Sequence, residues 1–201
     1  MASTYLMISR YPVTQDAAIP TCFADDAVTR HFWSDDQNEL LQLRAFDCLA
    51  DLPDILAEAE AQRQAAVPLL AGDVRRELLA LVEPVKNAAE ALPQTQHVQL
   101  RHVEVVPARM ADYRAWREAT IFDVVRSHDE VDSFAAYHSL ISGVPGVMFV
   151  SGFDGPVDRY ATVFSSDRYK TIVQQAGDSY ITGGTDGLYT RIYSRLSRLA
   201  A

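Results

Sequence analysis

Cysteine is scarce in this sequence, with only Cys22 and Cys48 among 201 residues. Neither belongs to a CxxC motif or to a cluster with histidine, which excludes the common zinc and dithiol redox motifs. Such sparse cysteine is typical of a reducing compartment, so we expect a cytoplasmic protein. No apolar run approaches the ~18 residues of a membrane-spanning helix, and the first residues lack the pattern of a signal peptide. We therefore expect no membrane partner.

The short motifs of several large enzyme classes are also missing. The sequence contains neither GxxxxGK[ST] nor GxGxxG, so nothing predicts a loop that cradles phosphate groups. HExxH is absent, which excludes the usual zinc protease helix, and without GxSxG a serine-hydrolase elbow is not expected. The motifs alone therefore name no reaction.

Basic residues are few, and lysine is nearly absent. The chain has 27 acidic and 18 basic residues, which gives a net charge of −9. Lys86 and Lys170 are its only lysines, and the other basic residues are arginines. This balance argues against a nucleic-acid partner, which would require a basic surface. Up to Pro93 there are 15 acids and 7 bases, and after it 12 acids and 11 bases. The acidity of the first part indicates a solvated helical face or, alternatively, a docking surface, and we expect a buried site in the near-neutral second part.

The second part of the chain predicts a regular order of elements. Residues with β-branched side chains indicate strands, and apolar residues three and four apart indicate helices. Pro107 suits the first turn of one helix, Ser165 or Ser166 caps another, and Gly177 closes it. The expected elements are a strand over 97–106, a helix to about 128, strands over 133–141 and 147–151, a helical turn over 157–164, a helix ending at 177 and a strand over 188–196. Apart from that helical turn, this is the β-α-β-β-α-β order of a ferredoxin-like unit.

The first part predicts a degraded copy of the same plan. Strands are expected over 4–11, 27–34 and 39–46, and a helix follows Asp51, but little helical pattern stands where the first helix should be. Segment 76–85 predicts the closing strand, although its composition also allows a helix. We therefore expect a degenerate ferredoxin-like unit over 1–93 and a more complete unit over 94–201.

Two ferredoxin-like units can bury the apolar faces of their sheets against each other. A four-stranded sheet with helices on one side leaves its other face apolar, so two sheets can pack face to face as a closed barrel. The stretches LRHVEVVPARMADYRAWRE, GVPGVMFVSGF and YKTIVQQAGDSYITGGTDGLYTRIYSRL resemble the dimeric α+β barrel superfamily, in particular its NIPSNAP-like and antibiotic-biosynthesis-monooxygenase-like members. The resemblance implies an α+β fold with antiparallel sheets packed as a barrel, either within one chain or between the chains of a homodimer.

The same resemblance implies a class of function. It suggests a small intracellular bacterial enzyme of the cofactor-independent oxygenase type, acting on an aromatic or polyketide-like metabolite. The alternatives are a non-catalytic haem- or small-ligand-binding protein, and an interaction protein that uses the acidic first part. We expect a small-molecule ligand, no metal, and no cofactor unless haem is bound.

Polar residues on strands that are covered on both faces are the catalytic candidates. His102 and His138 lie on strands that flank a third strand, so on a shared face they are ~9 to 10 Å apart and a small ligand can bridge them. Either histidine could be the base, with Tyr137 or Arg101 holding an oxyanion, in a pocket between sheet and helices of the second unit.

Aromatic residues are the candidates for binding substrate. In the second unit, Trp116, Tyr113 and Phe149 are expected to form an apolar wall. In the first unit, His31 and Trp33 share one face of a strand and could line an aromatic pocket. Ordinary core packing is the alternative for each of these residues.

Overall fold

The computed structural model describes residues 3–14, 21–88 and 92–195, and within these ranges the chain is an α+β protein. In chain order the strands and α-helices are β1 (Tyr5–Pro12), β2 (Thr29–Ser34), β3 (Glu39–Phe46), α1 (Leu52–Ala66), β4 (Arg75–Lys86), β5 (His97–Val103), α2 (Met110–Arg117), α3 (Asp123–Ser127), β6 (Ser133–Ile141), β7 (Val147–Phe153), α4 (Val157–Ser165), α5 (Asp167–Ser179) and β8 (Leu188–Arg195). A π-helical turn, Glu118–Phe122, joins α2 to α3.

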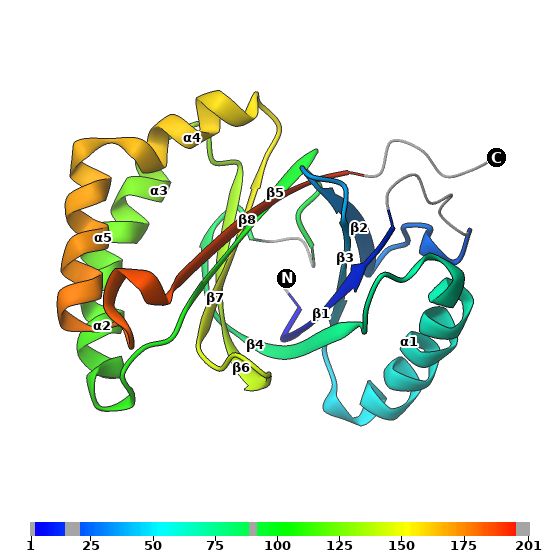
Figure 1. Cartoon of the computed structure of the whole chain (residues 1–201). Coiled ribbons are helices and arrows are strands. Elements are labelled where there is room, and N and C mark those ends of the chain that lie inside the picture. The colour runs from blue at the N-terminus through cyan, green and yellow to red at the C-terminus, as the bar shows by residue number, and fades with distance from the viewer. Residues whose placement is uncertain (1–2, 15–20, 89–91, 196–201) are drawn as a thin grey trace.

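All eight strands form one closed barrel, in the order β1-β3-β2-β8-β5-β7-β6-β4 (Figure 1). Every neighbouring pair is antiparallel. Strands β4-β1-β3-β2 form one ferredoxin-like sheet and β8-β5-β7-β6 form the other, which confirms the predicted fold. The two sheets join at two seams, β2 with β8 and β4 with β6, so the barrel closes within a single chain.

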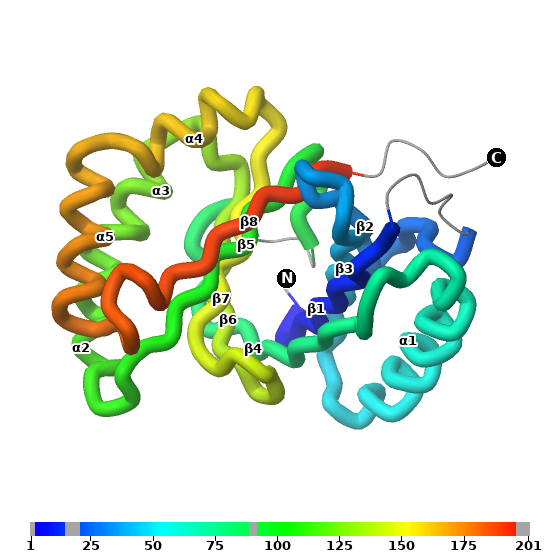
Figure 2. The backbone as a smooth tube through the Cα atoms, in the orientation of Figure 1, coloured from blue at the N-terminus to red at the C-terminus, as the bar shows by residue number. Residues whose placement is uncertain are grey.

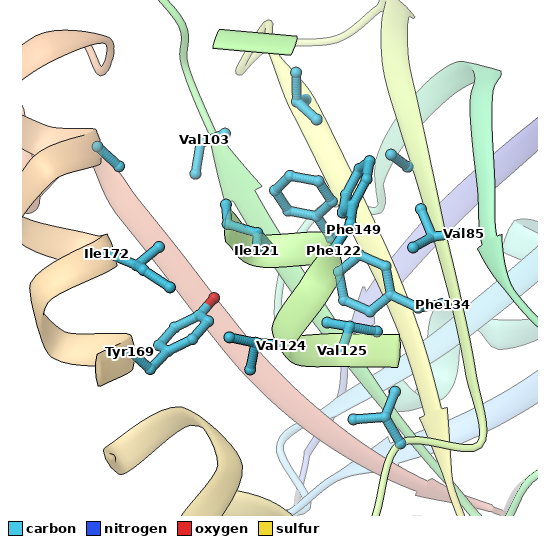
Figure 3. Close-up of a cluster of buried hydrophobic side chains, with 14 of the residues drawn as sticks. Val85, Val103, Ile121, Phe122, Val124, Val125, Phe134, Phe149, Tyr169 and Ile172 are labelled. Carbon is cyan, nitrogen blue, oxygen red and sulfur yellow. The ribbon is translucent and has the colours of Figure 1, made fainter. Parts of the chain in front are cut away.

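Alternation along the strands separates two cores. Side chains that point into the barrel form one apolar cluster, which includes Ile8, Leu43, Leu100, Val150 and Tyr193. Residues of opposite parity on β5, β6 and β7 face the helices of the second unit and form a second cluster. Figure 3 shows Phe122, Phe134 and Phe149 packed together in that second cluster.

Helices cover the two sheets unequally. Figure 2 shows α2, α3, α4 and α5 on one side of the barrel, against the second unit, and α1 alone on the other. Between β1 and β2 the described residues contain only a 3₁₀ turn, Thr21–Phe23, which agrees with the expected lack of a first helix. Segment 75–86 is a strand, as predicted. No helix in the described parts of the chain is long and apolar enough to cross a membrane.

Helix α5 extends beyond the predicted stop at Gly177. Ser166 caps it as expected, since its side chain accepts a hydrogen bond from the backbone N–H of Tyr169. Gly177, however, lies inside the helix, where a Cβ atom would come 2.9 Å from the backbone nitrogen of Thr185. The glycine therefore allows a close approach between the helix and the following loop rather than ending the helix.

The π-helical turn changes which residues of its segment are buried. The sequence predicts a stripe of Tyr113, Trp116, Thr120 and Val124, but Trp116 and Thr120 are only half-buried. A π turn adds a residue to the helical repeat and so shifts the phase of the helix. As a result Phe122, five residues after the buried Arg117, faces the sheet, whereas Arg117 itself lies four residues after Tyr113 on the same face of α2 and is 1% exposed.

The guanidinium of Arg117 is a charge held inside the second core. It donates a hydrogen bond to the carboxylate of Glu83 on β4. Its Cζ atom lies 5.4 Å from the ring centres of Tyr113 and Phe122 and 5.9 Å from that of Phe149. Burial of such a charge is tolerated only when it is paired, and aromatic faces add a weaker attraction.

Replacing Glu83 with alanine should leave the buried guanidinium of Arg117 unpaired. We expect the free energy of unfolding to fall by about 3 kcal/mol. Arg117→Met removes the charge together with its need for a partner, so we expect a smaller loss. Urea unfolding followed by tryptophan fluorescence measures both values. Equal losses in the two variants would contradict the role assigned to the ion pair.

Candidate functional site

The predicted catalytic residues lie on opposite faces of the second sheet. In the strand register His102 is opposite Met148, and Met148 is opposite Tyr137, so these three point into the barrel. His138 is opposite Val147, on the helix side, where Arg101 also lies. The structure therefore brings neither the two histidines nor His102 and Arg101 to one face.

Side chains fill the space between the second sheet and its helices, where the sequence predicts a pocket. Arg101 lies over the rings of Phe164 and Tyr169, at 4.5 and 5.1 Å from their centres, and donates a hydrogen bond to the Tyr169 hydroxyl. Phe149 is 1% exposed, and the ring of Tyr113 stacks on that of Trp116 at 5.8 Å. The predicted apolar wall is thus part of the packed core, because the helices of this unit cover the sheet closely.

The first unit, in contrast, has a cavity on the helix side of its sheet. A cleft of about 390 Å³ lies between this sheet, α1 and the segment before β2. Strand residues Met7, His31, Gln42 and Arg44 form its floor, and the other lining residues are Cys22, Ala24, Asp26, Thr29, Glu58, Ala59, Ala61 and Gln62. Among the described residues of this unit α1 is the one α-helix against the sheet, which gives a physical reason for the cleft.

A buried histidine and its polar neighbours form the centre of this cleft. His31 is 1% exposed, and its Nδ1 lies 3.1 Å from the Oδ1 atom of Asp25. On the other side of the ring, Nε2 lies 3.0 Å from the amide nitrogen of Gln42. The same amide donates to Gln62 Oε1 at 2.7 Å, and Gln62 also accepts a hydrogen bond from the Tyr11 hydroxyl.

These contacts select one form of the imidazole. The NH2 end of the Gln42 amide faces Nε2 of His31 and can only donate, so in this arrangement Nε2 is the acceptor. The ring proton then lies on Nδ1, which donates to Asp25. A carboxylate behind Nδ1 and a lone pair on Nε2 are the arrangement of a general base.

Asp25 is held by both units of the barrel. Its Oδ1 atom also accepts a hydrogen bond from the backbone N–H of His31 at 2.9 Å, and its Oδ2 atom accepts one from Arg195 on β8. Partial burial raises the pKa of Asp25, but the hydrogen bonds from His31 and the charge of Arg195 outweigh burial and lower this pKa below its usual 3.8. The carboxylate therefore stays ionised and fixes the orientation of the imidazole.

Aromatic side chains support the histidine from one side. The ring of Phe23 meets that of His31 edge to face, with 5.5 Å between ring centres. Trp33 shares the face of His31 on β2, as predicted, but packs against the buried cluster that contains Tyr11 and Phe23 rather than lining the cleft. Of the residues predicted to bind substrate, His31 is the one that lines this cleft.

Asp25, Gln42 and Gln62 were not among the site residues predicted from the sequence. Gln42 carries a recognisable signal, because it is a polar residue in an otherwise apolar stretch of strand and faces a covered side. Asp25 precedes the strand in irregular chain, and Gln62 lies on a helix with many polar residues, so neither stands out from its neighbours.

Both ring nitrogens of His31 are engaged in the arrangement that the structure shows, by Asp25 and by Gln42. An axial haem ligand needs one free ring nitrogen, so haem binding at His31 would require displacement of the Gln42 amide. Within the described residues no group of three or more histidine, cysteine, aspartate or glutamate side chains is placed to hold a metal ion.

Solved structures share this architecture over nearly the whole chain. A candidate monooxygenase from Fusobacterium nucleatum superposes with a TM-score of 0.69 and 11% identity, covering 98% of this chain and 94% of that one. For an anthrone oxidase-like protein the TM-score is 0.68, the identity 10%, and the coverage 100% and 96%. The chain has the dimeric α+β barrel fold.

The same fold carries other functions. A major regulator of staphylococcal pathogenesis superposes with a TM-score of 0.58 and 8% identity, over 96% of this chain and 99% of that one. No family model and no curated protein matches the sequence. Similarity at this level of identity shows the fold, so function has to be argued from the site.

Acidification tests the carboxylate that orients His31. A group whose pKa is lowered on folding stabilises the protein above its unfolded pKa, and this contribution is lost as the pH falls through the folded pKa. We therefore expect the stability that Asp25 contributes at pH 7 to decline once the pH falls below the usual pKa of 3.8, and to be lost below the lowered pKa of the folded state. Urea unfolding of wild type and Asp25→Asn at about pH 7 and about pH 3 measures it.

The two proteins should differ in stability at neutral pH and converge in acid. Asp129→Asn, at an exposed aspartate outside the cleft, is the matched control and should follow wild type at both pH values. A constant difference between wild type and Asp25→Asn across this range would contradict the assignment.

Proposed function

We propose that this chain is an oxygenase of the cofactor-independent type, acting on an aromatic or polyketide-like metabolite in the cleft beside α1. The observation that carries the proposal is the arrangement of the buried His31. Asp25 binds Nδ1 of its ring, and the lone pair of Nε2 faces the side-chain amide of Gln42, which a substrate can displace. The names of two structural neighbours, a candidate monooxygenase and an anthrone oxidase-like protein, support the same class.

Base catalysis fits the requirements of this chemistry. Molecular oxygen reacts with electron-rich carbanions, which form when a base removes a proton from an activated carbon or hydroxyl group. The neutral ring of His31 can accept that proton at Nε2, and the negative charge of Asp25 stabilises the imidazolium that results. A positioned base of this kind contributes about 10² to 10⁴ in rate.

The proposed reaction balances without an outside reductant. For a methylene group between aromatic rings, His31 takes one proton and leaves a carbanion. This carbanion transfers electrons to oxygen, and a carbon–oxygen bond forms to give a hydroperoxide once the terminal oxygen is protonated. Loss of water then leaves a carbonyl group, so one oxygen atom enters the product and the other leaves as water. The substrate itself is the reductant.

The glutamine amides have a role in the same step. Substrate that binds at Nε2 of His31 displaces the Gln42 amide from that nitrogen and so frees an N–H donor. A freed donor beside the base can stabilise the negative charge that develops on the substrate oxygen. Gln62 keeps the amide of Gln42 in place, since it accepts a hydrogen bond from it and donates one to the Cys22 carbonyl.

The proposal is tested with an anthrone as the probe substrate and oxygen uptake as the readout. We expect wild type to consume oxygen and form the quinone, and His31→Gln to lower kcat at least about 100-fold, because glutamine cannot accept the proton. His128→Gln, at a histidine whose ring caps a helix end elsewhere, is the matched control and should keep full activity.

Two results would refute this assignment. Undiminished oxygen uptake by a folded His31→Gln variant would show that His31 is not the base. Binding of the anthrone without oxygen uptake by wild type would favour the alternative of a non-catalytic ligand-binding protein. Thermal unfolding of each variant separates loss of the base from loss of the fold.

A further inference from the structure

A second cavity opens at one end of the barrel, away from the cleft. This barrel mouth has a volume of about 530 Å³ and is formed by strand ends from both units. Its lining residues are Arg10, Glu39, Arg75, Arg76, Glu77, His102, Ser142, Gly143, Val144, Met148, Tyr189 and Arg191. Cavities of this size accommodate small organic molecules, and the mouths of β-barrels are common places for them.

Polar side chains that reach across the barrel form the floor of the mouth. Arg10, 9% exposed, pairs with Glu77, and Glu77 also accepts a hydrogen bond from Ser142 of the other unit. Glu39 accepts a hydrogen bond from the Tyr193 hydroxyl at 2.7 Å and one from Arg191 at 3.2 Å. The charged side chains below the rim of the mouth are therefore held in fixed positions. Water and salt screen their interactions with a ligand less than they would at an exposed surface.

Two arginines in the mouth have N–H groups that can donate further hydrogen bonds. Arg10 uses one terminal nitrogen for Glu77, while its Nε atom is buried with no hydrogen-bond partner in the described structure. Arg75, on the exposed rim, forms no ion pair with any described residue. A buried donor without a partner costs about 1 to 3 kcal/mol, so a ligand that supplies an acceptor at Arg10 is favoured.

Arg75 is an arginine of the mouth that has no carboxylate partner among the described residues. Four arginines and two glutamates line the mouth, but the guanidinium of Arg76 turns to α1, where it donates a hydrogen bond to the Ala59 carbonyl. Arg10 pairs with Glu77, and Arg191 binds Glu39 and the rim carboxylate of Asp36. The unpaired charge of Arg75 favours a small anion, and the side-on edge of an arginine matches the two oxygens of a carboxylate.

The rest of the lining is suited to an apolar body. Met148 lies opposite His102 across β5 and β7, and Tyr189 lies opposite His102 across β5 and β8. The Tyr189 ring also lies 6.0 Å from Arg10, measured from its centre to Cζ. Val144 is exposed at the tip of the β6–β7 hairpin, on the rim of the cavity.

From this combination we propose that the barrel mouth binds a small organic acid, with its carboxylate on Arg10 and Arg75 and its compact apolar body against Met148, Val144 and Tyr189. Neither arginine lines the cleft that contains His31, so this binding site is independent of the proposed oxygenase reaction.

The test is calorimetric titration of the full chain with sodium benzoate and with benzamide, its neutral counterpart of nearly the same shape. We expect benzoate to bind and benzamide to bind at least about tenfold more weakly, because only the carboxylate makes charge-assisted hydrogen bonds. Arg75→Ala, at the exposed rim, should weaken benzoate binding about tenfold.

A second variant protects the test against misfolding. Arg10→Lys keeps the charge beside Glu77 but lacks the side-on edge, so benzoate should again bind about tenfold more weakly. Arg168→Ala, at an exposed arginine on α5, is the control and should bind benzoate as wild type does.

Several outcomes would overturn the proposal. These are equal binding of benzoate and benzamide, binding of neither, unchanged benzoate affinity in Arg75→Ala and Arg10→Lys, or tighter binding of inorganic phosphate than of benzoate. Because oxygen uptake depends on His31, failure here would leave the proposed oxygenase activity untouched, and loss of oxygen uptake would leave this proposal standing.

Discussion

Backbone pairing at the two seams of the barrel is the constraint on which the rest of the structure depends. A ferredoxin-like sheet taken alone has two edge strands, which here are β2 and β4 in one unit and β6 and β8 in the other. Pairing β2 with β8 and β4 with β6 satisfies all four edges at once and buries the inner apolar faces. Each sheet therefore depends on the other to keep its polar side chains in fixed positions.

Closure of the barrel also explains why the two cavities differ in character. The cleft lies on the outer face of one sheet, where α1 covers the strands, and its central polar groups belong to one hydrogen-bond network around His31. The mouth lies inside the barrel, where side chains from both units meet, so its groups are charged and paired across the seams. Arg195 connects the second unit to the cleft, since this residue of β8 binds the Asp25 carboxylate of the first unit.

The sequence was informative where the pattern is local. The segments 39–46 and 133–141, each next to a turn, were predicted as strands with the observed bounds of β3 and β6, and Ser166 was one of the two predicted caps. The π turn was not predictable from a repeat of 3.6 residues, and so the inward position of Phe122 was missed. The burial of Arg117 was missed for another reason, since a charged side chain is not expected on the apolar face of a helix. The faces of His102 and His138 depend on the register of three strands, and the partner of His31 lies in irregular chain. Such contacts are fixed by tertiary packing.

Fusion of two units into one chain releases the barrel from symmetry. In a homodimer every substitution appears twice, so a helix lost from one subunit is lost from both, and any site occurs as an identical pair. Here α2, α3, α4 and α5 cover the second unit, while in the described residues of the first unit α1 is the one α-helix, and this unit carries the cleft. The first unit can therefore change the residues of its cleft while the second unit keeps its packed core, although the two units have similar topology.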